Sequence, residues 1–419
     1  MQKINTLVTD EMNFFKGINP VDLIAQWGSP LYVYNESIIR QRAREMKNLV
    51  SYKNFEVNYS AKANSNLAFL QLIREEGLLV DAVSTGEIYA EQLAGFSSDE
   101  IFFVSNNLSA EEMQYAIDRN ILMSVDSISQ LEQYGKLNPN SKIAVRFNSG
   151  VGVGHHVKVV TGGKSTKFGV HPQDISKVKE LLKKYNLTLV GINHHIGSLF
   201  MEPEPYINGA YALLDIAKQF EDLEFIDIGG GLGIPYRKQE GQARLDLKVL
   251  GEKLDALITS FAKEYGKEVT VKIEPGRYIS AESGILLGRV NAIKNNEDIK
   301  FIGTDIGFNT LLRPAMYDSH HDIEVFRASD IMSDKKEVVT IVGNICESGD
   351  IISKQVLLPE ISQGDVLAVL DAGAYGYAMS SNYNNRPRPT EILIRENGEV
   401  ILIRKRDTFE DIIQNQIKL

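Results

Sequence analysis

The 419-residue sequence contains a single cysteine, Cys346, and a single tryptophan. One cysteine excludes an internal disulfide framework and is typical of proteins from a reducing compartment. Basic residues are also in the minority, because 45 lysines and arginines face 55 aspartates and glutamates, which gives a net charge of −10. This balance, without a basic cluster, argues against nucleic acid or an anionic membrane surface as the main partner.

Long apolar runs are missing as well. No stretch approaches the ~20 consecutive apolar residues of a membrane-spanning helix, and residues 1–5 show no apolar core of a signal peptide. We therefore expect a cytoplasmic protein with no membrane partner. The seven histidines form three adjacent pairs plus His171. Since adjacent residues on a strand point to opposite sides, no metal site is predicted.

The sequence does contain a long alternation of strand and helix patterns. Several of the helical patterns begin with capping signals, at Ser84, Ser109 and Ser127. The strand-like runs lie near residues 55–60, 79–83, 101–104, 121–125, 142–147, 188–194, 223–228 and 269–274. Eight such units over roughly 220 residues favour an α/β fold of the (β/α)₈ barrel type, although a doubly wound open sheet remains possible.

After about residue 285 the pattern changes to strands without long helices between them. These runs lie at 300–304, 323–326, 338–342, 351–357, 366–370, 391–395 and 399–404, and a hairpin signal, Glu396 to Glu399, joins the last two. We predict a barrel domain over residues 36–285. Residues 1–35 plus 286–419 should form a mostly antiparallel β domain that takes in the N-terminal strand Leu31 to Tyr34.

A lysine follows the first barrel strand directly. Lys62 lies where the run Phe55 to Tyr59 gives way to a helical pattern, and α/β barrels place their chemistry at such strand ends. Lysine is also the side chain whose primary amine forms an imine with a carbonyl group. On this stretch alone, a solvated loop charge is the simpler interpretation.

Further candidate groups follow the last three barrel strands. They are His195 and Ser198 after strand six, Gly229, Gly230 and Gly231 after strand seven, and Glu274 and Arg277 after strand eight. Loops after strands seven and eight commonly bind phosphate, and glycines let backbone N–H groups approach an anion. A plain tight turn would also explain the glycines, and an ion pair would explain Glu274 with Arg277.

Together these groups suit a ligand with an aldehyde, an aromatic ring and a phosphate. Lys62 would form the imine, His195 would stack on the ring, and the three glycines with Ser198 would hold the phosphate. Glu274 would bond to the ring nitrogen and keep it protonated, which makes the ring a stronger electron sink. The ligand with these parts is pyridoxal 5′-phosphate.

Eight motifs, taken in order, give the chain a specific resemblance. They are Tyr59-Ser60-Ala61-Lys62, Asp81-Ala82-Val83-Ser84, His195-Ile196-Gly197-Ser198, Gly229-Gly230-Gly231, Glu274-Pro275-Gly276-Arg277, Arg313-Pro314-Ala315-Met316-Tyr317, Cys346-Glu347-Ser348-Gly349-Asp350 and Gly373-Ala374-Tyr375-Gly376. From about Leu31 to about Arg404 the sequence resembles the alanine-racemase-type pyridoxal-phosphate enzymes, and among them the diaminopimelate decarboxylases. It departs from them at Asn344, where a proline is more usual.

The resemblance implies decarboxylation of meso-2,6-diaminopimelate to L-lysine and CO2, the last step of lysine biosynthesis, with pyridoxal 5′-phosphate as cofactor. It implies a homodimer whose active sites are shared across the interface, and a mobile loop over the site at residues 150–163. The implied catalytic residues are Lys62, His195, Glu274 and Cys346, the last as proton donor. The implied cofactor contacts are Lys62, Asp81, His195, Ser198, Gly229, Gly230, Gly231, Glu274, Pro275, Gly276, Arg277 and Tyr375. The implied substrate contacts are Arg277, Arg313, Tyr317, Glu347 and Tyr375.

Other functions on this fold stay open at this point. A decarboxylase of ornithine, arginine or carboxynorspermidine would need acidic groups for most of these substrates, whereas Arg277 and Arg313 suit a second carboxylate. A racemase would need a second base opposite Lys62, and none is apparent. A non-catalytic regulatory homologue would not need to keep Lys62, Glu274 and Cys346 together.

Overall fold

The structure, a computed structural model, describes residues 7–150, 152, 163, 166–328 and 335–419. The chain divides into two compact units. Unit 1 comprises Met1–Ile39, Pro235–Ala243 and Ser280–Leu419, and unit 2 comprises Arg40–Ile234 and Arg244–Ile279. The segment Pro235–Ala243 therefore belongs to unit 1, although it falls inside the range 36–285 predicted for the barrel. Most of the loop expected at 150–163 lies outside the described residues.

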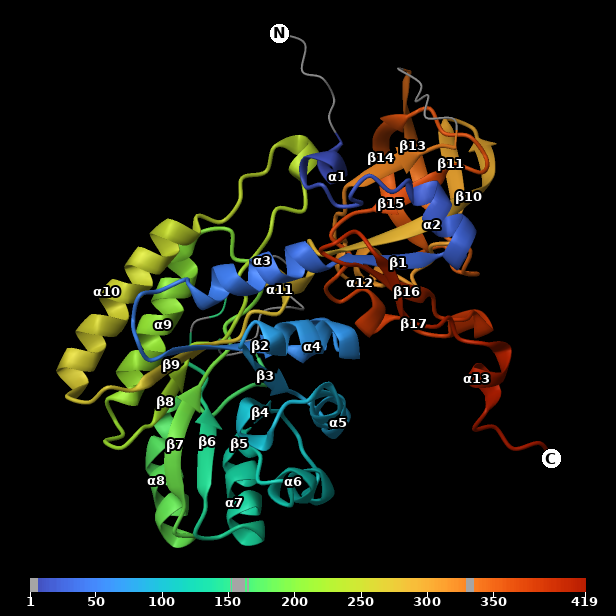
Figure 1. The fold of residues 1–419 in the computed structure, drawn as a ribbon. Helices are drawn as coiled ribbons and strands as arrows, with labels where there is room; N and C mark the ends of the chain where they lie inside the picture. The colour runs from blue at the N-terminus through green and yellow to red at the C-terminus, as the bar shows by residue number, and fades with distance from the viewer. Residues whose placement is uncertain (1–6, 151, 153–162, 164–165, 329–334) are drawn as a thin grey trace. The chain divides into compact units, whose positions relative to one another are not determined.

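Unit 2 is a closed barrel of eight parallel strands with helices around it (Figure 1). The strands are β2 Phe55–Ser60, β3 Leu79–Ala82, β4 Ile101–Val104, β5 Leu122–Val125, β6 Lys142–Arg146, β7 Thr188–Asn193, β8 Phe225–Asp227 and β9 Thr270–Ile273. The ring closes where β2 pairs with β9, with Phe55 opposite Val271. The predicted barrel is confirmed, and each predicted run contains one of these strands.

Helices surround the barrel. They are α3 Glu36–Lys47, α4 Leu67–Glu75, α5 Thr85–Ala94, α6 Ala110–Ile117, α7 Ile128–Leu137, α8 Ile175–Lys184, α9 Pro203–Ala217, α10 Leu247–Tyr265 and α11 Arg277–Ser280. Three of them, α5, α6 and α7, begin directly after the capping residues read from the sequence, Ser84, Ser109 and Ser127. Ser109 forms the full capping box with Glu112. Ser127 also caps its helix, but the expected return bond is wrong, because the Gln130 side chain instead bonds both backbone groups of Leu108.

Alternation along β2 sets the side chains that face the barrel interior. The ring of Tyr59 stacks on Phe69 of α4, with ring centres 5.5 Å apart, so Tyr59 faces outwards. Ser60 consequently points inwards, since successive strand residues face opposite sides. Its hydroxyl donates a hydrogen bond to the Asp81 carboxylate at 2.7 Å. Inward polar groups thus gather at the carboxyl end of the strands.

Unit 1 is built on a nine-stranded sheet (Figure 1). Its strands are β1 Leu31–Asn35, β10 Gly284–Asn296, β11 Ile299–Thr304, β12 Ile323–Phe326, β13 Lys336–Val342, β14 Ile351–Pro359, β15 Val366–Val369, β16 Thr390–Ile394 and β17 Val400–Arg404. The order is β14-β13-β11-β10-β1-β16-β17, with β15 pairing with β10 and β12. All pairs are antiparallel except β1 with β16 and β11 with β13. The mostly antiparallel β domain with its N-terminal strand is therefore confirmed.

The long strand β10 is the element of this sheet that the sequence does not reveal. Its first residues are buried against β1 and β15, whereas its second half is exposed and pairs with β11. Polar residues such as Arg289, Lys294 and Asn295 interrupt the apolar pattern of the exposed half. A strand that passes from core to surface in this way keeps no single periodicity.

Four short helices lie in the described part of unit 1, and one of them packs on the sheet in a hydrophobic core. They are α1 Val8–Glu11, α2 Pro20–Trp27, α12 Arg313–Tyr317 and α13 Phe409–Ile413. Leu23 and Ile24 of α2 are buried in one cluster with Leu31 and Val33 of β1 and Ile392 of β16. In the described part of the chain, no helix combines the length and apolar character needed to cross a membrane.

Candidate active site

Lys62 lies among carboxyl groups at the carboxyl end of the barrel. It belongs to the short 3-10 helix η1, Ala61–Ala63, which follows β2 directly. Burial raises the pKa of the carboxyl groups of Asp81, Glu87 and Glu274, and the positive charge of Lys62 opposes that rise in all three. The strand-end rule therefore places the predicted Lys62, Asp81 and Glu274 in one electrostatic group.

Glu274 and Asp227 form a buried carboxyl pair after β9 and at the end of β8. Burial, and then the negative charge of Asp227, raise the pKa of Glu274 well above its ordinary value, while burial raises the pKa of Asp227 to about 6. Asp227 accepts the N–H of Gly229 at 2.9 Å, which favours its ionised form. At neutral pH the proton of the pair is therefore on Glu274. In the described part of the chain, Oε1 of Glu274 is buried and has no hydrogen-bond partner.

Both histidines after β7 are neutral. Burial and the positive charge of Arg146 hold the pKa of His194 at about 3, and its Nδ1 lies 3.1 Å from the Ser149 hydroxyl. Burial and the charge of Lys62 hold the pKa of His195 well below its ordinary value. Nδ1 of His195 accepts the N–H of Gly230 at 3.3 Å. His195 thus offers an uncharged ring close to Lys62.

The triple glycine is required by close backbone packing. A Cβ on Gly230 would lie 1.9 Å from the carbonyl oxygen of Glu274, and one on Gly231 would lie 2.4 Å from that of Gly197. The N–H groups of Gly229 and Gly230 donate to Asp227 and His195, as described above. For these two N–H groups to bind a phosphate, both bonds would have to open.

Arg277 and Ser198, two further predicted residues, are in direct contact. Nη2 of Arg277 donates to the Ser198 hydroxyl at 3.0 Å, and the arginine side chain is buried. The preceding Gly276 packs closely on β2, because a Cβ there would lie 3.0 Å from the side chains of Ser60 and Ala63. The loop after β9, including Pro275, is thereby held beside the residues that flank Lys62.

Three residues of this rim are not singled out by the sequence analysis. Burial lowers the pKa of Arg146, the last residue of β6, against the charges of Glu274 and Asp126. Tyr206 of α9 donates its hydroxyl proton to the carbonyl of Gly229 at 2.7 Å. The third residue is Asp227, the last residue of β8. Because Arg146 and Asp227 both end barrel strands, the rule that points to Lys62 also points to them. Tyr206 lies mid-helix and carries no such signal.

The other predicted residues lie in unit 1. Arg313 and Tyr317 are the two ends of α12. Cys346 and Glu347 are exposed in the connection between β13 and β14. Tyr375 follows β15 and is half-buried, with a φ of +55°.

The loop that carries Cys346 is well braced. Asn384 donates from Nδ2 to the Cys346 sulfur at 3.3 Å and accepts the Cys346 N–H at 3.0 Å. Glu347 accepts a bond from the Tyr383 hydroxyl at 2.6 Å. The carbonyl of Asn344, the residue that departs from the family motif, accepts a bond from Arg386 at 2.9 Å. These contacts hold the thiol and the neighbouring carboxylate in defined positions.

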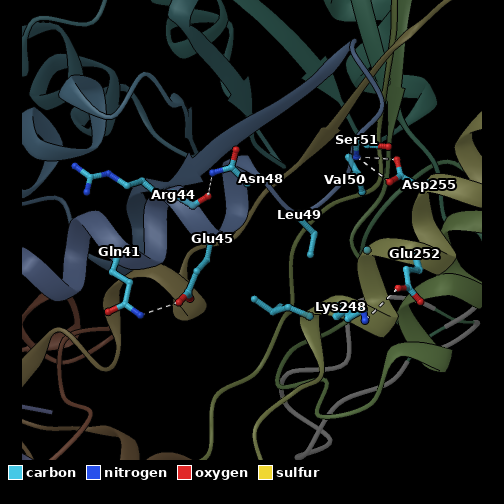
Figure 2. A pocket seen from close by; sticks show the side chains of 12 residues that line it. Gln41, Arg44, Glu45, Asn48, Leu49, Val50, Ser51, Lys248, Glu252 and Asp255 are labelled. Atoms are coloured by element: carbon cyan, nitrogen blue, oxygen red, sulfur yellow. Dashed lines mark hydrogen bonds and ion pairs between the residues drawn. The ribbon is translucent and has the colours of Figure 1, made fainter.

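A pocket of about 710 Å³ lies between α3 and the start of α10 and contains none of these residues (Figure 2). Its polar side chains bond mainly to one another or to backbone. Gln41 donates to Glu45 at 2.9 Å, and Asp255 accepts the N–H of Ser51 at 2.8 Å. A surface whose polar groups are already paired offers little to a charged substrate, so this pocket is not the candidate site.

Comparison with known proteins agrees with this geometry. Residues 36–281 match the family model described as pyridoxal-dependent decarboxylase, pyridoxal binding domain. Over 96% of its length, the chain is 43% identical to diaminopimelate decarboxylase from Methanothermobacter thermautotrophicus, of which it covers 94%. The Escherichia coli K12 enzyme of the same name is 35% identical, over 94% of this chain and 95% of that protein. The chain belongs to the diaminopimelate decarboxylase family.

Solved structures of this family have the same fold. The diaminopimelate decarboxylase from M. jannaschii, in co-complex with L-lysine, superposes with a TM-score of 0.88 at 33% identity, over 96% of this chain and 95% of that one. The Helicobacter pylori enzyme complexed with L-lysine gives a TM-score of 0.85 at 32% identity, over 94% and 98%. A lysine/ornithine decarboxylase from Vibrio vulnificus, at 21% identity and a TM-score of 0.78, shares the fold.

The rim of the barrel fits the cofactor of this family, pyridoxal 5′-phosphate. Lys62 offers a primary amine that could hold its aldehyde, and the buried, unpartnered Oε1 of Glu274 is suited to a ring nitrogen. Neutral His195 suits stacking against an aromatic ring. Gly231 and Gly276 let their loops pack closely beside this rim, because a Cβ on either would crowd neighbouring protein atoms.

One more carboxyl group is buried close to Asp81 and Glu87. Glu91 of α5 is fully buried, and neither of its carboxyl oxygens has a hydrogen-bond partner among the described residues. Burial, and then the charges of Asp81 and Glu87, raise the pKa of Glu91 from 4.5 to about 9. Glu91 is therefore protonated in the folded protein at neutral pH.

We predict that Glu91 makes the protein less stable as the pH rises. The unfolded chain releases the Glu91 proton near pH 4.5, whereas the folded chain holds it to about pH 9. The contribution of Glu91 to the free energy of unfolding is therefore complete below pH 4.5. It is lost as the pH rises towards 9, by up to about 1.4 kcal/mol per pH unit. Urea unfolding at pH 5.5 and 8 should show a smaller loss in Glu91→Gln than in the wild type. The exposed Glu180→Gln is the control, and equal losses in all three proteins would contradict the prediction.

Proposed function

We propose that the chain decarboxylates meso-2,6-diaminopimelate at its D-centre to give L-lysine and CO2, with pyridoxal 5′-phosphate as cofactor. The observation that carries the choice of substrate is Arg313, a buried guanidinium in unit 1 that suits the carboxylate the product retains. Ornithine and arginine have no second carboxylate, so Arg313 favours diaminopimelate over them. Similarity to diaminopimelate decarboxylases along nearly the full chain supports the same choice.

Pyridoxal 5′-phosphate supplies the electron sink for the electron pair left when CO2 departs. In our proposal Lys62 would hold the cofactor covalently, and the neutral ring of His195 would stack on its ring. Glu274, whose buried carboxyl group has a raised pKa, would bond to the ring nitrogen and keep it protonated. Asp81 would contact the cofactor beside Lys62, whose positive charge opposes the rise in the pKa of the Asp81 carboxyl group.

The phosphate group needs donors rather than charge alone. The N–H groups of Gly229 and Gly230 already donate to Asp227 and His195, so we assign these two glycines to the shape of the turn. We assign the phosphate contacts to Ser198, Gly231 and Arg277, with Pro275 and Gly276 setting the course of the loop and Tyr375 adding a hydroxyl. Arg277 can also reach a substrate carboxylate.

The substrate and its proton involve residues of unit 1. Arg313 would bind the retained carboxylate, and Tyr317 and Tyr375 would line the same region. Glu347 would bind the substrate's distal ammonium group. The Cys346 thiol, positioned by Asn384, would deliver the proton that replaces CO2.

The substrate assignment predicts which compounds the enzyme decarboxylates. Purified enzyme with the cofactor should release CO2 from meso-diaminopimelate and not from the LL isomer, ornithine or arginine. Arg313→Met should raise KM for diaminopimelate by a factor equivalent to about 2–5 kcal/mol, since a buried charged partner is lost. Arg237→Met, which alters a half-exposed arginine paired with Glu240, is the matched control. A wild-type preference for ornithine would refute the assignment.

We also infer a homodimer in which each active site is shared. Cys346 and Glu347 are exposed in this chain, whereas a proton donor that serves one face of a substrate works best shielded from water. A second copy of the chain could provide that shield, and a two-fold interface would complete two sites at once.

Mixing inactive variants tests the shared site. Lys62→Ala and Cys346→Ala chains should each be nearly inactive alone. In a mixed dimer, one of the two sites would combine an intact Lys62 with an intact Cys346. Statistical exchange puts about half the dimers in that state, so activity should return to roughly a quarter of wild type. If differently tagged chains exchange and activity stays absent, Cys346 serves the barrel of its own chain.

The exposed thiol of Cys346 also indicates the cellular compartment in which the enzyme works. A catalytic thiol must stay reduced, and a reducing cytoplasm keeps it so without further protection. We therefore propose a cytoplasmic enzyme. Secretion of the active enzyme into an oxidising space would contradict this placement.

A further inference from the structure

Arg313 is packed against a histidine and a tyrosine within unit 1. Its Nη1 lies 2.7 Å from Nε2 of His321, and its Cζ lies 4.5 Å from the centre of the Tyr236 ring. The rings of Tyr236 and His321 meet edge to face, with centres 5.3 Å apart and planes at 79°. Arg313 and His321 are each 2% exposed. We call these three buried side chains, Arg313, His321 and Tyr236, the arginine clamp.

The hydrogen bonds of His321 fix its protonation. A guanidinium can only donate, so Nε2 of His321 must accept from Arg313. Nδ1 lies 2.7 Å from the carbonyl oxygen of Leu370, which can only accept, so Nδ1 carries the proton and donates it there. His321 is thus neutral in a single tautomer. Since the face of Tyr236 is also uncharged, these two side chains orient the guanidinium without adding a negative charge of their own.

The segment that carries Tyr236 is itself fastened within unit 1. Two residues along, Lys238 donates to both carboxylate oxygens of Asp371, at 2.6 and 2.7 Å. The N–H of Gln239 donates to Asp322 at 3.0 Å, directly beside His321 in the sequence. The tyrosine and histidine of the clamp are therefore held together by bonds other than their own contacts.

We infer that His321 and Tyr236 are positioning residues that fix the plane of Arg313 for the carboxylate the substrate retains. This inference rests on the proposed function. A guanidinium recognises a carboxylate through two parallel N–H bonds, and this pairing requires the plane of the fork to match that of the carboxylate. His321 and Tyr236 fix that plane in advance and so spare the substrate the cost of ordering Arg313.

Two small amines isolate the carboxylate contact. L-lysine, the proposed product, keeps the retained carboxylate, and cadaverine is the same molecule without it. The ratio of their inhibition constants against diaminopimelate decarboxylation therefore measures how well the enzyme recognises that one group. A change that merely loosens the fold would weaken both inhibitors and leave the ratio nearly unaltered.

Two substitutions at His321 separate positioning from structural support. An asparagine places its amide nitrogen near the position of Nδ1, so His321→Asn can still donate to Leu370 but offers no acceptor to Arg313. A glutamine places its amide oxygen near the position of Nε2, so His321→Gln can still accept from Arg313 but gives up Leu370. Each variant loses one hydrogen bond of His321, and only the asparagine variant loses the bond to Arg313.

We expect His321→Asn to reduce the preference for L-lysine over cadaverine at least about tenfold, the effect of losing a hydrogen bond to a charged group. KM for diaminopimelate should rise by a similar factor while kcat changes much less. His321→Gln should retain both values within about threefold. His320→Asn, which alters the neighbouring histidine bonded to Asp322, should leave the ratio unchanged.

Equal effects of the asparagine and glutamine variants, or an unchanged ratio in the asparagine variant, would overturn the inference. If His321→Asn does not fold, Tyr236→Leu and Tyr236→Phe provide the same comparison, because only phenylalanine keeps the aromatic face under Arg313. Loss of the ratio in the leucine variant alone supports the inference, and equal ratios overturn it. A wild-type enzyme that does not decarboxylate diaminopimelate would instead contradict the proposed function.

Discussion

Burial of several ionisable groups at one end of the barrel is the constraint on which the rest of this site depends. An isolated charge in such a place costs several kcal/mol, so each group must find a partner or change its protonation. Glu274 takes up a proton beside Asp227, whose ionised form the Gly229 N–H supports. His195 stays neutral near the charge of Lys62. The result is a lysine, a proton-carrying carboxyl group and an uncharged ring held close together.

Unit 1 also buries an ionisable group, but this group remains charged. There the buried charge is Arg313, which contacts the neutral ring of His321 and the aromatic face of Tyr236. These two side chains orient the guanidinium, and neither brings a negative charge that would compete with an anionic ligand. In our proposal the barrel rim thus carries the reaction and the arginine clamp selects the substrate.

The sequence predicts the barrel well because each strand is short, apolar and bounded by turn or cap signals. Lys62 and Glu274 are predictable for a related reason, since strand ends of a barrel share one rim. Arg146 and Asp227 also end barrel strands, so the same rule applies to them. The bonds made by the N–H groups of Gly229 and Gly230, and the contact of His321 with Arg313, depend on packing between distant segments. Such contacts cannot be predicted from a local sequence pattern. The strand β10 cannot be predicted either, because it passes from core to surface and keeps no single periodicity.

The central claim is that the rim around Lys62 is where the cofactor binds. Reduction of the purified holoenzyme with sodium borohydride converts a lysine-bound pyridoxal phosphate into a stable secondary amine. Digestion and mass spectrometry then identify the modified residue. The account predicts that the phosphopyridoxyl mass appears on the peptide that contains Lys62 and disappears in Lys62→Ala. A stoichiometric label on any other lysine of the wild-type enzyme would contradict it.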